Sequence, residues 1–114
     1  IRPGTHINAI GAFTPEMHEI PPETVARARV VVDAVDAVLA EAGDLIAPIA
    51  AGLVSRDHVT TELGQVVAGN APGRPDNDAV TLFKSVGNAV QDIIVARQAV
   101  IEAERQGRGQ EITL

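Results

Sequence analysis

The sequence predicts an α/β fold with a parallel sheet, followed by one long helix. Three observations support this prediction. First, short apolar segments rich in β-branched residues alternate with helical segments. Second, each apolar segment is followed by a glycine, an acid or a turn. Third, apolar side chains recur at helical spacing over residues 88–106. Chains that alternate in this way place helices against the faces of a parallel sheet.

Turn residues and prolines set the elements of the first part of the chain. A proline–glycine turn precedes residues 5–12, whose isoleucines indicate a buried strand that ends at Gly11. Three prolines between residues 13 and 22 exclude a regular helix or a central strand there. A helix with an early proline and acid is expected over residues 22–29, and three valines at 30–32 indicate a short buried parallel strand.

Helix-stopping residues divide the rest of the chain. A helix over residues 36–41 is expected to end at Gly43, with residues 42–46 as an exit loop that Pro48 keeps from continuing as a helix. Asp57 is expected to cap a turn or short helix. The remaining expected elements are a helix at 62–68, a loop at 70–78, a strand at 79–83, a turn at 86–87, the long helix at 88–106 and a last strand at 112–114.

Charge and composition exclude several classes of protein. A net charge of −6 opposes binding to a phosphate backbone, so we expect no nucleic-acid partner. The absence of cysteine excludes disulfides and thiolate zinc sites, and fits a cytoplasmic location. No apolar run approaches the roughly 20 residues needed to cross a bilayer, so we expect no membrane partner. The start at Ile1 lacks a signal-peptide pattern, and we expect the chain to begin inside a longer gene product.

The loop after the first expected strand is a candidate ligand site. It runs from Asn8 to Ala12 and follows the carboxyl end of a strand, where open α/β sheets bind ligands. Gly11 and Ala12 would let the backbone approach a cofactor closely. The alternative is that Gly11 merely ends the strand.

A second strand-to-helix junction, at residues 81–87, carries Ser85. Its hydroxyl and the nearby backbone N–H groups would face a ligand at the start of the long helix. The alternative is a helix cap followed by a turn glycine.

The remaining polar residues suggest little chemistry. The histidines lack the spacing of a zinc helix, so we expect no metal site. Glu16 and Glu19 lie near His18 and would form an acid–base cluster or, as is usual for charged residues in a proline-rich loop, be solvated.

Three longer blocks of sequence follow one another in a specific order. They are PGTHINAIGAFTPEMHEI, ARVVVDAVDAVLAEAGDL and TLFKSVGNAVQDIIVARQAVIEAERQGRG. The third fits the pattern T-[ILV]-F-[DK]-S-x-G-x-A-x-[QE]-D. Together the blocks cover nearly the whole chain, and in this order they resemble the ornithine cyclodeaminase/mu-crystallin family.

The resemblance implies a Rossmann-type domain that binds NAD(H) or NADP(H), joined to a substrate and dimerisation domain. Residues 1–85 would be the later part of the Rossmann sheet. Residues 86–114 would be the long helix and tail of the substrate and dimerisation domain. The implied partners are the missing N-terminal half of the same protein, a small imino or amino acid, and a second copy in a homodimer.

Alignment with the family assigns site residues. Those assigned to the cofactor are Asn8, Ile10, Gly11, Ala12, Phe13, Met17 and Ser85. Phe13 and Val86 are assigned to the substrate. No catalytic residue is assigned, because the family's lysine and arginines lie upstream of this chain.

Phe13 is the main departure from the family. Ornithine cyclodeaminases carry a catalytic Asp at this position, and a phenylalanine cannot transfer a proton or pair with an ammonium group. Ornithine cyclisation is therefore not expected. The segment GAFTPEM is similar to the corresponding segment of imine reductases that act on cyclic 2-carboxylates, in which the cofactor supplies the hydride.

The implied function is reduction of small cyclic imino acids of the pyrroline-2-carboxylate or ketimine type. The alternatives are an alanine-type amino-acid dehydrogenase of the same family and a non-catalytic, crystallin-like NAD(P)-binding protein. We expect the 114-residue chain alone to be inactive, because the glycine-rich phosphate loop would lie upstream. If the gene encodes only this chain, it would be a subunit or a degenerate fragment.

Overall fold

A three-stranded parallel sheet forms the centre of the computed structural model, which describes residues 1–110 and 112. The strands are β1 (His6–Ala9), β2 (Arg29–Val32) and β3 (Thr81–Lys84), and their order is β1-β3-β2. The last strand in the sequence therefore lies between the first two. The expected α/β class with a parallel sheet is confirmed.

The register of the sheet brings the carboxyl ends of all three strands to one edge. Lys84, the last residue of β3, pairs with Ala9 at the end of β1 and with Val32 at the end of β2. The loops that follow the strands consequently leave the sheet side by side.

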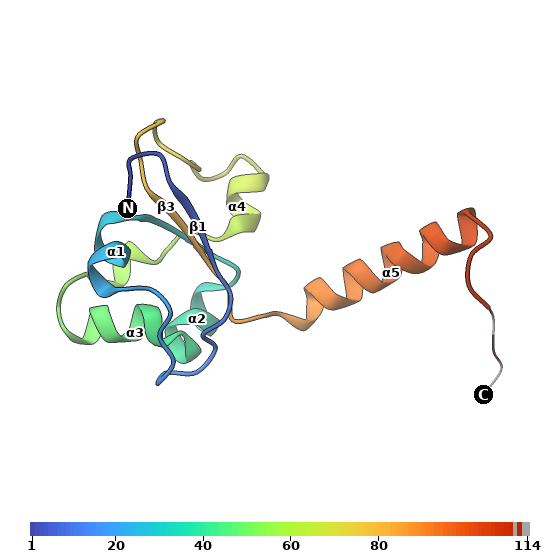
Figure 1. The fold of residues 1–114 in the computed structure, drawn as a ribbon, viewed down its shortest axis with the longest axis horizontal. Coiled ribbons are helices and arrows are strands. Elements are labelled where there is room, and N and C mark those ends of the chain that lie inside the picture. The colour runs from blue at the N-terminus through green and yellow to red at the C-terminus, as the bar shows by residue number, and fades with distance from the viewer. Residues whose placement is uncertain (111, 113–114) are drawn as a thin grey trace.

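Helices cover one face of this sheet. They are α1 (Pro22–Arg27), α2 (Val35–Glu41) and α3 (Gly43–Ala50), which lie together in Figure 1. The core between them and the sheet is aliphatic, and its largest fully buried members are Val25, Val30, Val32, Val38, Leu45, Val59 and Leu82. A 3-10 turn at Arg56–His58, whose His58 Nε2 lies 2.9 Å from the carbonyl oxygen of Val25 in α1, leads to the short helix α4 (Leu63–Val67) over the other face.

β1 differs from the buried strand expected over residues 5–12. It is shorter, and His6 and Asn8 are exposed, while Ala9 is buried. The physical reason is its place in the sheet: β1 is an edge strand, and His6 and Asn8 border an open hollow instead of a packed layer of helices.

The prediction of an exit loop over residues 42–46 is also wrong. Gly43 begins helix α3, which continues through Pro48. A proline at this position removes one helical hydrogen bond. Leu45 and Pro48 are nevertheless buried in the interior, so tertiary packing outweighs the local preference of the sequence.

The long helix is confirmed as α5 (Ala89–Arg105), and it projects away from the sheet (Figure 1). Its cap is Asn88, whose side chain accepts a hydrogen bond from the N–H of Val90. The alternative role of Ser85 as a helix cap is therefore wrong. Asp57 likewise does not cap the 3-10 turn through its side chain.

Two further observations complete the fold. Most of the strand expected over residues 112–114 falls outside the described residues, and Ile112 itself is in no strand. In the part of the chain that the structure describes, no helix is both long enough and apolar enough to cross a membrane.

Candidate active site

The two segments predicted to form the site, residues 8–13 and 85–86, meet at one edge of the sheet. The N–H of Ser85 donates to the carbonyl of Ala9 at 3.2 Å, immediately before Ile10. On the other side of β3, the N–H of Asp33 donates to the carbonyl of Lys84 at 3.3 Å. The loops after β1, β2 and β3 thus meet where a parallel sheet binds ligands.

Glu19 holds the loop after β1. Its Oε1 accepts hydrogen bonds from the backbone N–H of Gly11 at 2.9 Å and of Ala12 at 3.3 Å. The same oxygen lies 3.1 Å from Nζ of Lys84. Burial alone raises the pKa of Glu19, but the N–H of Gly11, the Lys84 ammonium and the N–H of Ala12 together lower that pKa below its usual value. Glu19 is therefore held through Oε1, while a third of its side chain stays exposed as its proline-rich loop suggests.

Lys84 is the centre of this arrangement. Its side chain is fully buried and lies 2.9 Å from Oδ2 of Asp44, which is also fully buried. Oδ1 of Asp44 accepts the N–H groups of Glu19 at 2.7 Å and Ile20 at 2.9 Å. One buried cation thereby connects β3, the start of α3 and the loop that carries Glu19.

Asp33 holds the loop after β3. Its Oδ2 accepts the Ser85 hydroxyl at 2.6 Å and the N–H groups of Val86 at 3.1 Å and Gly87 at 3.2 Å. Gly87 has φ of 93°, a conformation that other residues rarely adopt. The hydroxyl of Ser85 is buried and donates to Asp33, so Ser85 positions the loop rather than offering a free proton donor.

The outer side of the site is apolar. Ile10 is 69% exposed and Phe13 is 56% exposed, although both belong to a loop whose backbone is held from behind. Ala12 is buried and Val86 is half-buried. Such side chains can pack against a flat ring, but they cannot transfer a proton.

Met17 lies farther along the same loop. Its N–H donates to Thr14, and its carbonyl lies against Gly43 at the start of α3. Among the described residues no hydrogen bond joins Met17 to Gly11 or to Ser85. Its role toward the cofactor stays a prediction.

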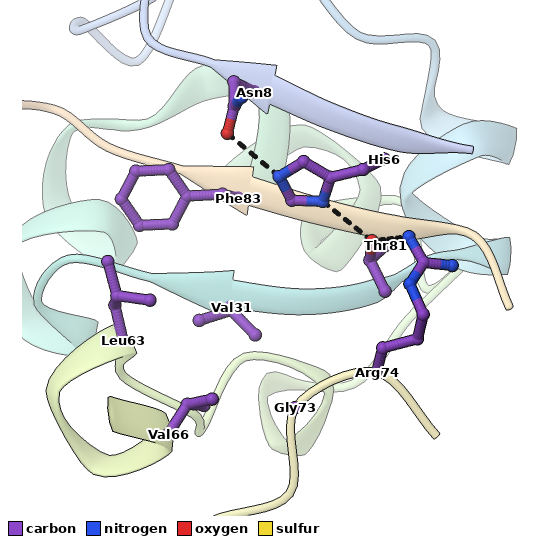
Figure 2. A pocket seen from close by; sticks show the side chains of 9 residues that line it. All are labelled: His6, Asn8, Val31, Leu63, Val66, Gly73, Arg74, Thr81 and Phe83. Atoms are coloured by element: carbon purple, nitrogen blue, oxygen red, sulfur yellow. Dashed lines mark hydrogen bonds between the residues drawn. The ribbon is translucent and has the colours of Figure 1, made fainter. Parts of the chain in front are cut away.

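A separate hollow of about 480 Å³ lies over the open face of the sheet (Figure 2). His6 Nδ1 is 2.7 Å from Oγ1 of Thr81, and His6 Nε2 is 3.0 Å from Oδ1 of Asn8. Arg74 donates to the same Thr81 hydroxyl at 2.9 Å. Asn8 is the one predicted site residue that lines this hollow, and Figure 2 shows its side-chain oxygen directed to His6.

Three site residues were missed from the sequence: Asp33, Asp44 and Lys84. Lys84 carried a usable signal, because it ends an apolar strand at the position that alternates inward with Leu82. A lysine at a buried strand position requires a carboxylate partner. No local pattern identified Glu19 and Asp44 as those partners.

Comparison with known proteins agrees with this architecture. The profile described as "Ornithine cyclodeaminase/mu-crystallin family" matches residues 1–107. The chain belongs to this family. A Delta(1)-pyrroline-2-carboxylate reductase of Bacillus cereus is 44% identical over 113 residues, which cover 98% of this chain and 35% of that protein.

Two solved structures have the same fold. The Delta(1)-pyrroline-2-carboxylate reductase of Thermococcus litoralis, in complex with NADH and L-proline, is 42% identical with a TM-score of 0.89, over 98% of this chain and 35% of that one. The iminosuccinate reductase of Paracoccus denitrificans, in complex with NAD+, is 40% identical with a TM-score of 0.85, over 100% and 34%. The chain thus spans about a third of the length of these relatives.

Proposed function

We propose that this chain is the C-terminal part of an NAD(P)H-dependent reductase of small cyclic imino acids, of the pyrroline-2-carboxylate type. The observation that carries the proposal is the pair of apolar side chains, Ile10 and Phe13, exposed on a braced loop at the carboxyl edge of the sheet. The likeness to two reductases of imino acids supports the same chemistry.

The residues at this edge fit the nicotinamide end of a dinucleotide. Gly11 lets the loop lie close to Glu19, because a Cβ at Gly11 would come within 2.6 Å of Glu19 Oε2. Ile10 and Phe13, both exposed, offer apolar contact to a ring. When bound, the cofactor would supply a hydride to the C=N carbon of the substrate. Ser85 and Val86 would border the substrate on the neighbouring loop.

Within this chain the proposed roles are orientation and exclusion of water. Phe13 would present a benzyl group to the imine ring, and its lack of a carboxylate would disfavour substrates that carry a side-chain ammonium group. Ser85 is not proposed as the donor of the proton that accompanies reduction, because its hydroxyl already donates to Asp33.

The test is turnover by the complete protein that contains this chain. We expect oxidation of NADH or NADPH, followed at 340 nm, with pyrroline-2-carboxylate, and no release of ammonia from ornithine. Oxidation of the cofactor with pyruvate and ammonia only would favour the alanine-type dehydrogenase instead. Tight cofactor binding without turnover of any imine would favour the crystallin-like alternative.

A two-part organisation is proposed as well, with residues 1–85 in the cofactor domain and residues 86–114 in the substrate and dimerisation domain. The positive φ of Gly87 and the lack of any buried residue in α5 support this division. We propose that the missing N-terminal half covers the open sheet face. The complete protein is proposed to be a cytoplasmic homodimer, which the uncovered apolar side chains of α5 and the absence of cysteine support.

A further inference from the structure

The buried ion-pair cluster of Lys84, Glu19 and Asp44 lies directly behind the loop proposed to touch the cofactor. Lys84 is 0% exposed, although a buried ammonium group is costly unless carboxylates surround it. Asp44 lies 2.9 Å from the Lys84 ammonium group and is equally buried, so it provides a buried counter-charge. Glu19 is one-third exposed and directs one oxygen to both Lys84 and the loop.

The difference in exposure between Asp44 and Glu19 indicates two different roles. Asp44 holds Lys84 and the backbone of Glu19 and Ile20, so it maintains the fold. Glu19 links that rigid base to the N–H groups of Gly11 and Ala12. Because those two donors are occupied by Glu19, they are not available to a ligand, and the loop can meet a cofactor only through its remaining groups.

We propose that Glu19, supported by Lys84, is a positioning residue that sets the backbone of Gly11–Phe13 for contact with the nicotinamide ring. The proposal rests on the function proposed above. Glu19 itself would touch neither cofactor nor substrate. Its effect would be confined to the part of the dinucleotide that lies over this loop.

Glu19→Ala in the complete protein tests the proposal, with NADH, NADPH and ADP-ribose as probes. ADP-ribose carries the adenosine and pyrophosphate but no nicotinamide. Loss of two hydrogen bonds to a carboxylate is expected to weaken binding of the preferred dinucleotide by about ten-fold, and binding of ADP-ribose by less than about two-fold. Glu19→Gln, which retains an acceptor oxygen, is expected to recover part of the loss.

Glu16→Ala is the matched control, because Glu16 lies exposed in the same loop and makes no hydrogen bond within the described part of the chain. It is expected to leave all three affinities unchanged. Glu19→Ala is expected to fold, since Lys84 keeps Asp44 as its partner.

Equal weakening of the dinucleotide and ADP-ribose by Glu19→Ala would overturn the proposal, because Glu19 would then act on the whole fold. Unchanged affinity for both would overturn it as well. Failure of the unsubstituted protein to bind NADH and NADPH would instead refute the proposed function on which it rests. The two failures are therefore distinguishable.

Discussion

Gly43 has no room for a side chain. A Cβ at this position would collide with the backbone carbonyls of Met17 and Pro15, which cannot move aside as a flexible side chain would. Gly43→Ala is therefore expected to destabilise the protein by about 1–3 kcal/mol and to disturb the loop that carries Glu19. Thermal or urea unfolding of the complete protein measures the change.

Gly64→Ala is the control for this substitution, since both glycines lie at the start of a helix. A Cβ at Gly64 would meet no atom within 4 Å. We expect it to be neutral or to stabilise by up to about 1 kcal/mol, through helix propensity. An equal loss of stability in both variants would contradict the explanation by close packing.

Asp33 accepts three hydrogen bonds on Oδ2 and one on Oδ1, and an asparagine cannot keep all of them. In either orientation of the amide, an NH₂ group faces an N–H that now donates to Asp33, from Ala34 or from Val86. Asp33→Asn is expected to cost about 1.5–3 kcal/mol of stability and to reduce kcat/KM for the imine by about ten-fold. Asp57→Asn, at an exposed position, is the control. Full activity in Asp33→Asn would show that the loop after β3 does not need this anchor.

The lowered pKa of Glu19 predicts how the stability of the protein depends on pH. The pKa of Glu19 is lower in the folded chain than the ordinary value of 4.5, because two backbone N–H groups and Lys84 outweigh the effect of burial. The resulting stabilisation is present above that ordinary value and is lost as the pH falls through the folded pKa. The difference in unfolding midpoint between the protein and Glu19→Gln should therefore shrink as the pH is lowered from 6 to 3. A difference independent of pH would mean that the carboxylate charge contributes nothing.

Among the elements, α5 packs least against the rest of the described chain. Ile93, Ile94 and Val95 are each more than 60% exposed, and no residue of the helix is buried. A helix with this much apolar surface is expected to pack against another part of the protein or a second copy.

Ile94→Glu tests this expectation for α5. We expect the complete protein to lose about 1.5–3 kcal/mol of stability, or to dissociate if the helix packs against a second copy. Gln91→Glu, one turn earlier on the same helix, controls for the added charge. Unfolding and light scattering measure the two effects, and identical behaviour of both variants would indicate that α5 is solvated in the complete protein.

At the scale of the whole molecule, the isolated chain leaves much of its apolar and polar surface uncovered. Among the residues that the structure describes, β1 pairs only with β3, so its outer edge has unpaired backbone groups, and the hollow of Figure 2 opens over the sheet. The purified 114-residue chain is therefore expected to associate or precipitate, and to bind a hydrophobic dye. Sedimentation velocity checks this, and a monomer with a sharp thermal transition would contradict it.

The candidate site shows how far sequence reasoning reaches. Ile10–Phe13 and Ser85–Val86 were assigned through resemblance and local pattern, and the register of β1 and β3 brings the two segments to one edge. Their roles toward a cofactor stay predictions. Asp33 and Lys84, which help to hold these segments, were not identified, and Glu19 was considered only as part of an acid–base cluster or as solvated. The reason is that the partners of these residues lie on other elements.

The sequence alone determined the elements that depend on neighbouring residues. Alternating apolar segments, the long helical repeat and three ordered blocks were sufficient for the α/β class and the family. Only the tertiary structure decided that β3 lies between β1 and β2, that residues 43–50 are helical, and that Lys84 is enclosed by Glu19 and Asp44. The physical reason is range: periodicity and turn preference act over a few residues, whereas strand order, helix burial and buried charge pairing are set by segments distant in the chain.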